Sequence, residues 1–164
     1  MTTTTQKGNG KGAAELILMV GAPAAGKTTV RRERFAHLAA VDADEIKAER
    51  DGFDPKRPEV FHTWSTQEAV RRAMGLLSRQ TSFVFDGTGS NVERLSMLAQ
   101  VARSSGMTVR AVFVTCTLET SLGRNAARER NVPEQIVREK HAKVMESWSL
   151  VRSFCDSFEV VSND

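Results

Sequence analysis

One stretch of the chain has the residue types and spacing of a phosphate-binding loop. Residues 21–28 read Gly-Ala-Pro-Ala-Ala-Gly-Lys-Thr and fit the pattern G-x-x-x-x-G-K-[ST] at every fixed position. Glycines let the backbone wrap closely so that its N–H groups face phosphate oxygens, and the N-terminus of a following helix adds a favourable dipole. The pattern predicts that Lys27 bridges the β- and γ-phosphates of ATP and that the Thr28 hydroxyl binds Mg²⁺.

The context of this stretch favours that interpretation over a chance match. It directly follows the apolar run Leu16–Val20 and directly precedes a helix expected from about Lys27 to Ala36. By itself the pattern predicts nucleotide binding and leaves the reaction undefined. The residues predicted to bind the nucleotide are Gly21, Ala22, Pro23, Ala24, Ala25, Gly26, Lys27, Thr28, Thr29 and Arg124.

Acidic residues follow the second predicted strand, near Leu38–Val41. A kinase needs a carboxylate that orients the acceptor hydroxyl and takes its proton, and an aspartate with its ordinary pKa of ~3.9 is ionised at neutral pH. We predict this role for Asp44 and a substrate contact for Asp42. Capping of the following helix is the alternative for both residues.

A third aspartate follows the apolar residues Phe83–Phe85. Asp86 stands where a Walker-B acid holds Mg²⁺, directly or through water. The polar segment after it is expected to contact the acceptor through Gly87, Thr88, Gly89 and Asn91. The alternative is a simple strand-to-helix turn with Asn91 as the helix cap.

An arginine-rich segment follows the fourth predicted strand. Arg124 and Arg128 are four residues apart, so both are expected on one face of a helix. Arginines that a mobile lid brings over the transferring phosphoryl group stabilise its negative charge. The alternative is a solvated helix in which Glu129 and Glu134 pair with the arginines. A similar lid role for Arg130 stays open.

These side chains need a scaffold that brings them together. Strand-like and helix-like segments alternate from Glu15 onward, which predicts an α/β fold with a central parallel sheet and helices on both faces. Ligands bind outside the carboxyl ends of such strands, where the loop and the aspartates fall. Residues 1–13, rich in threonine and glycine, are predicted to be a disordered tail before one domain at 14–164.

Composition narrows the class of protein further. The chain has 164 residues, a formal net charge of +3 and a pI near 9.1, which permits a nucleic-acid partner without requiring one. No apolar run approaches the ~20 residues that span a bilayer, and the N-terminus lacks the apolar core of a signal peptide. We therefore expect a cytoplasmic protein with no membrane partner, in an oligomeric state that the sequence does not define.

Taken together, the motifs resemble the kinases grouped around polynucleotide kinase and zeta toxin, over about Leu16 to Asn163. The resemblance implies a three-layer P-loop kinase fold with a helical lid, Asp44 as general base, and Arg124 and Arg128 as lid arginines. It places Lys47 where a basic residue, often arginine, contacts the acceptor phosphate in polynucleotide kinases. Gly87-Thr88-Gly89 is more similar to zeta toxin, which phosphorylates a nucleotide-sugar and has glutamate at the Asp86 position.

Three functions follow, in decreasing order of support. The first is transfer of the γ-phosphoryl group of Mg-ATP to a hydroxyl on nucleic acid, either a polynucleotide 5′-hydroxyl or a hydroxyl on a modified DNA base. The second is a small-molecule kinase that acts on a nucleotide-sugar or similar metabolite. The third is a nucleotide-dependent switch without transfer, which would need neither a second acidic site nor a lid.

Overall fold

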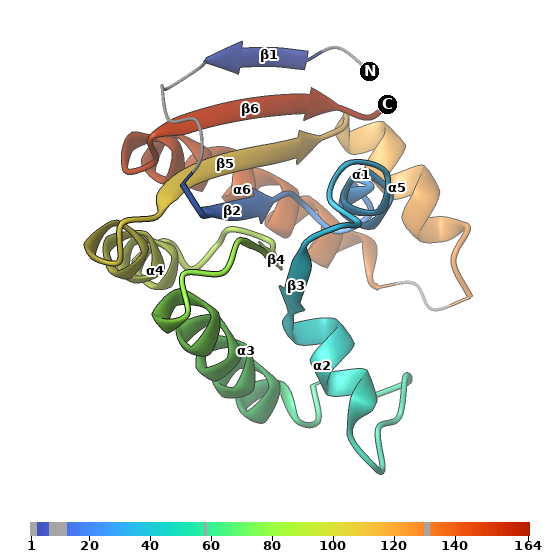
Figure 1. The fold of residues 1–164 in the computed structure, drawn as a ribbon. Helices are drawn as coiled ribbons and strands as arrows, with labels where there is room; N and C mark the ends of the chain where they lie inside the picture. The colour runs from blue at the N-terminus through green and yellow to red at the C-terminus, as the bar shows by residue number, and fades with distance from the viewer. Residues whose placement is uncertain (1–2, 7–12, 58, 130–131) are drawn as a thin grey trace.

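The computed structural model describes residues 3–6, 13–57, 59–129 and 132–164. In these ranges strands and helices alternate from β2 to β6, as the sequence predicts (Figure 1). The strands are β1 (Thr3–Gln6), β2 (Glu15–Val20), β3 (Ala39–Asp42), β4 (Phe83–Gly87), β5 (Thr108–Thr115) and β6 (Ser157–Ser162). The helices are α1 (Lys27–Arg34), α2 (Ala43–Glu49), α3 (His62–Ser78), α4 (Val92–Ser104), α5 (Leu118–Ala126) and α6 (Glu134–Ser153).

All strands join one sheet in the order β1-β6-β5-β2-β4-β3. The five strands from β6 to β3 are parallel, which confirms the predicted α/β fold with a central parallel sheet. Each parallel connection crosses over through at least one helix, as parallel pairing requires.

The predicted disordered tail is wrong for four of its residues. Thr3–Gln6 forms β1, which runs antiparallel along β6 with Thr3 opposite Val161 and Gln6 opposite Phe158. β-Branched threonines suit a strand, and the open edge of β6 offers unpaired backbone groups. The remaining tail residues, apart from Ala13, lie outside the described ranges.

The alternation of side chains along β2 separates two hydrophobic layers. Leu16 and Leu18 pack on one face of the sheet, against apolar residues of α3, α4 and α6. Ile17 and Met19 pack on the other face, against Val30 of α1. The molecule therefore has three layers, with β2 buried on both sides as its continuous apolar run predicts. In the described ranges, no helix is both long enough and apolar enough to cross a membrane.

The sheet brings the predicted site residues to one edge. From β2 the chain first builds β3 and β4 on one side and then β5 and β6 on the other, so the loop after β2 lies at the point where the strand order reverses. In the paired strands β3 and β4, Asp42 lies directly opposite Asp86. The phosphate-binding loop and both aspartates thus share the carboxyl edge of the sheet.

Candidate active site

The loop between β2 and α1 has the backbone that its glycines predict. Gly26 has a φ of +92°, a conformation that residues with a side chain rarely adopt. It directly precedes the first helical residue, Lys27. The Lys27 ammonium donates to the Gly21 carbonyl at 2.9 Å. Burial lowers the pKa of Lys27, against the opposing effect of the nearby Asp86 and Asp42 carboxylates. The ammonium is therefore held inside the loop, beside the acidic edge.

An arginine that sequence analysis missed links the acidic residues. Arg31 is buried, and its guanidinium donates to Asp86 Oδ2 at 2.9 Å, to Asp42 Oδ2 at 3.2 Å and to the Glu45 carboxylate. The spacing between Lys27 and Arg31 could have indicated this role, because residues four apart share a face of a helix. Arg31 fixes the two aspartates relative to α1.

The electrostatic balance at the two aspartates is set mainly by burial. The pKa of Asp86 is raised to about 6, chiefly by burial and in part by the Asp42 carboxylate, although Lys27 and Arg31 act to lower it. Burial also raises the pKa of Asp42, against the hydrogen bond from the Asp44 N–H. The site therefore holds carboxylates that favour a neighbouring cation.

The oxygen groups at this edge suit Mg²⁺. The exposed Thr28 hydroxyl at the start of α1 and the Asp86 carboxylate are hard oxygen donors. Mg²⁺ is commonly bound by one or two carboxylates together with substrate phosphates, in place of a dedicated protein cage. Accordingly, the described residues contain no group of three or more His, Cys, Asp or Glu side chains that would hold a metal ion. Thr28 and Asp86 therefore fit a metal that arrives with the nucleotide.

The start of α2 separates the roles of its two aspartates. Asp42 is the N-cap, and its Oδ1 accepts from the Asp44 N–H at 2.9 Å and the Glu45 N–H at 3.4 Å, which confirms the capping alternative for Asp42. Asp44 is not the cap, and its side chain is 92% exposed. The Asp44 carboxylate lies 3.9 Å from the ammonium of Lys47, whose side chain is only 5% exposed. An accessible carboxylate thus stands beside a buried cation.

The segment after β4 is a tight turn. Gly89 has a φ of +86°, and a Cβ there would come within 2.8 Å of the Val20 side chain, so the turn requires glycine. Asn91 accepts from the Arg94 N–H at 3.0 Å and caps α4, which confirms the capping alternative for Asn91. Thr88 Oγ1 lies 3.0 Å from the Ser90 hydroxyl. Acceptor contacts by Gly87, Thr88, Gly89 and Asn91 stay predictions.

The two predicted lid arginines do not share a helical face. α5 ends at Ala126, and Arg128 lies beyond its C-cap, exposed, in a turn that its N–H closes onto the Asn125 carbonyl. Arg124 instead donates to the Ala24 carbonyl at 3.2 Å and to the Asn163 carbonyl at 2.6 Å. The single-helix prediction is therefore wrong because the helix stops earlier than its charge pattern indicates.

A buried asparagine closes the segment that carries Arg128. The Asn125 Nδ2 donates to the Val132 carbonyl at 2.8 Å, and its Oδ1 accepts from the Val132 N–H at 3.0 Å.

Glu134, one of the acidic residues that the solvated-helix alternative invokes, pairs with Arg138 at 2.6 Å. Arg130 lies outside the described residues.

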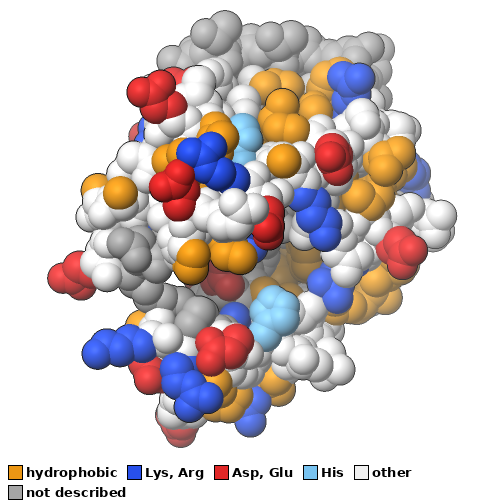
Figure 2. All heavy atoms as spheres, turned by 180° about the vertical axis from the view of Figure 1, so that it is seen from behind, with side chains coloured by type: hydrophobic (Ala, Val, Ile, Leu, Met, Phe, Trp, Pro, Cys, Tyr) orange, Lys and Arg blue, Asp and Glu red, His pale blue; other side chains and the backbone are white. Residues whose placement is uncertain are grey.

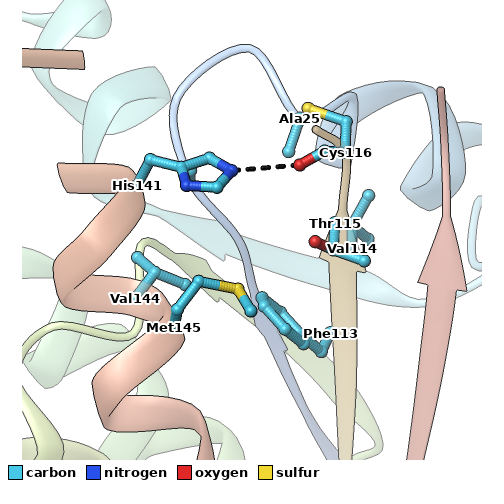
Figure 3. A pocket seen from close by; sticks show the side chains of 9 residues that line it. Ala25, Phe113, Val114, Thr115, Cys116, His141, Val144 and Met145 are labelled. Carbon is cyan, nitrogen blue, oxygen red and sulfur yellow. Dashed lines mark hydrogen bonds between the residues drawn. The ribbon is translucent and has the colours of Figure 1, made fainter. Parts of the chain in front are cut away.

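A small cavity adjoins the loop on the side of α6. It is lined by Ala22 and Ala25 of the loop, by the end of β5 and by α6, with a volume of only about 10 Å³. Figure 3 shows His141 pointing from α6 across this space, where Nε2 lies 3.0 Å from the Cys116 carbonyl oxygen. Most of the lining is apolar, including Phe113, so the cavity is part of the packing behind the loop.

One face of the molecule is hollowed below its centre, and Asp or Glu, Lys or Arg, and histidine side chains surround the hollow (Figure 2). On this face acidic and basic side chains are interspersed, and no single sign forms a continuous track.

Comparison with known families agrees with this geometry. The family described as an AAA domain matches residues 16–150, and the chain belongs to that family. The match covers the phosphate-binding loop, the acidic edge and the arginine segment. A comparison with curated proteins finds no match.

Solved structures share the fold. AvrRxo1-ORF1:AvrRxo1-ORF2 with sulphate ions is 20% identical with a TM-score of 0.74, over 93% of this chain and 55% of that one. The PezAT toxin–antitoxin system of Streptococcus pneumoniae is 15% identical with a TM-score of 0.72, and the match covers 96% of this chain and 71% of that one. The Pnkp1/Rnl/Hen1 RNA repair complex is 16% identical with a TM-score of 0.68, and the match covers 86% of this chain and 47% of that one.

These likenesses define the class of fold. The chain has the three-layer P-loop kinase fold that its resemblance to polynucleotide kinases and zeta toxins implies. It spans about half the length of the AvrRxo1 chain that it matches.

Proposed function

We propose that this protein is an ATP-dependent kinase that transfers the γ-phosphoryl group to a hydroxyl, with Asp44 as general base. The observation that carries the proposal is the pairing of a P-loop with an exposed carboxylate at the same sheet edge. A nucleotide-dependent switch would need the loop alone. The site adds a carboxylate whose exposure leaves it open to a second substrate.

The residues divide the chemistry between them. Asp44 accepts the proton of the acceptor hydroxyl while the hydroxyl oxygen attacks the γ-phosphorus. The bond from that phosphorus to the oxygen that bridges it to the β-phosphorus then breaks, which releases ADP. Lys27 offsets charge on the β- and γ-phosphates, and Arg128, exposed beyond α5, is available to approach the equatorial oxygens. Thr28 and Asp86 would hold the Mg²⁺ that is bound with ATP, and this ion would offset charge on the same phosphates.

The acceptor that we propose is a hydroxyl at the end of a nucleic-acid strand. Lys47 lies 3.9 Å from Asp44, so its positive charge would attract a phosphate of the acceptor and favour a neighbouring hydroxyl near the base. The exposure of Asp44 suits a polymer end, which a closed pocket would exclude. Interspersed charges on the hollowed face favour recognition of an end over binding along a backbone track (Figure 2). The structural likeness to the RNA repair complex supports the same choice.

A small-molecule kinase is the second candidate. Its support is the Gly87-Thr88-Gly89 turn, which packs against Val20 at the end of β2 and so reaches the phosphate-binding loop. A nucleotide-sugar also presents a phosphate close to hydroxyl groups, and Lys47 would serve it in the same way.

A transfer assay separates the candidates. ATP labelled at the γ-phosphate is offered with 5′-hydroxyl DNA and RNA oligonucleotides, DNA with hydroxylated bases, and a panel of nucleotide-sugars. We expect label on an oligonucleotide. Label on a nucleotide-sugar alone would establish the second candidate, and ADP binding without transfer to any acceptor would contradict a kinase.

A further inference from the structure

Side chains from distant segments hold the backbone carbonyls of the phosphate-binding loop from outside. They come from α5 and from the residues after β6, about 100 or more positions away in sequence. The three carbonyls that accept these bonds belong to three consecutive residues of the loop. The bonds run from Ser121 Oγ to Pro23 O (2.9 Å), from Arg124 Nη1 to Ala24 O (3.2 Å) and from Asn163 Nδ2 to Ala25 O (3.0 Å).

The three donors form one unit, which we call the loop brace: Ser121, Arg124 and Asn163. Arg124 also donates to the Asn163 carbonyl at 2.6 Å, which ties α5 to the segment after β6. Ser121 is fully buried, and its bond to the Pro23 carbonyl is part-buried. A Cβ at Gly26 would meet Asn163 Nδ2 at 1.9 Å, so the asparagine amide occupies the space that the missing side chain leaves.

The hydrogen bonds act together with the packing around this part of the loop. Ala22 and Ala25 line the small cavity shown in Figure 3, on the side of α6. Buried backbone carbonyls need hydrogen-bond partners, and the three donors supply one to each of these carbonyls. A loop whose carbonyls point outward turns its N–H groups inward, which is the orientation that phosphate binding requires.

We propose that the loop brace positions the phosphate-binding loop, holding it in its phosphate-binding shape before the nucleotide arrives. This rests on the proposed nucleotide-binding function. It gives Ser121 and Asn163 roles as positioning residues that touch neither substrate. It also gives Arg124 a task on the outside of the loop, separate from charge neutralisation. The brace contributes to nucleotide affinity by preorganisation, so its loss weakens binding more than it slows transfer.

The test is an Asn163→Ala variant, with Ser162→Ala as the matched control in the neighbouring position. Calorimetry gives the Kd of Mg-ADP, and steady-state assays give KM for ATP and kcat. We expect Asn163→Ala to raise both the Kd of Mg-ADP and KM for ATP about tenfold, the effect of one lost buried hydrogen bond, with kcat changed less than about threefold. Ser162→Ala should match the wild type.

Unchanged Mg-ADP affinity in Asn163→Ala would overturn the proposal, as would a loss of kcat with KM unaltered. Ser121→Ala, which removes a different bond of the brace, should reproduce the rise in Kd, and wild-type affinity there would also contradict the brace. Because ADP binding needs no acceptor, a wild-type protein that binds Mg-ADP but transfers nothing would contradict the kinase alone and leave the brace standing.

Discussion

At the residue scale, the cluster of Arg31, Asp42 and Asp86 joins the phosphate-binding helix to the two strands beside it. Its members are buried or half-buried and their bonds are short. The two aspartates were predictable from the sequence because each follows an apolar run, whereas Arg31 was not, because an arginine on a helix reads as solvated until a tertiary partner is known.

Asp86 should make the stability of the metal-free protein depend on pH. Its pKa is raised from 3.8 to about 6 in the fold, chiefly by burial, so between these values the folded protein binds more protons than the unfolded chain. The contribution of Asp86 to stability therefore falls as pH rises through about 6. Relative to Asp86→Asn, the wild type should lose about 1 kcal/mol of unfolding free energy between pH 5 and pH 7.

Urea unfolding of both proteins at the two pH values, with a chelator present, measures this difference. A wild type that gains stability relative to Asp86→Asn as pH rises would contradict the raised pKa.

At the scale of the element, α2 depends on its first residue. Asp42 caps the helix through two backbone N–H groups and also pairs with Arg31. Asp42→Asn removes the charge but retains a capping oxygen, whereas Asp42→Ala removes both. We expect Asp42→Ala to be less stable than Asp42→Asn by about 1 kcal/mol, the usual value of an N-cap.

Denaturant unfolding of the two variants at one pH gives that difference directly. Equal stability would show that the cap contributes nothing and that only the ion pair with Arg31 matters.

Elements were more predictable than the contacts between them. The apolar runs of β2 and β4 and the glycine-rich loop define the centre of the sheet from local pattern alone. The end of α5 was misplaced because Arg128 and Glu129 continue a helix-compatible composition past Ala126. Asn163 carries no local signal, since its side chain bonds the Ala25 carbonyl, which lies more than 100 residues earlier in the chain. Contacts of that separation appear only once the fold brings β6 beside β5.

At the scale of the whole molecule, α6 is fastened to the sheet by aromatic packing. Trp148 is 9% exposed and stacks on Phe113 of β5, with ring centroids 4.8 Å apart. Trp148→Ala should cost about 3–5 kcal/mol, since it removes a large buried side chain and leaves a cavity. Leu150 on the same helix is 57% exposed, so Leu150→Ala should change stability by less than about 0.5 kcal/mol.

Thermal unfolding of both variants tests whether α6 packs as described. Equal stability of the Trp148→Ala and Leu150→Ala proteins would contradict the packing of Trp148 against the sheet.

The central claim is that Asp44 acts as the general base of a phosphoryl transfer. The most direct measurement is single-turnover transfer of labelled phosphate from ATP to the acceptor by wild type, Asp44→Asn and Asp51→Asn, the last being a control at another exposed aspartate. We predict that Asp44→Asn lowers the transfer rate about 10²–10⁴-fold with ATP affinity near the wild-type value, and that Asp51→Asn changes neither. Transfer by Asp44→Asn at the wild-type rate would contradict the claim.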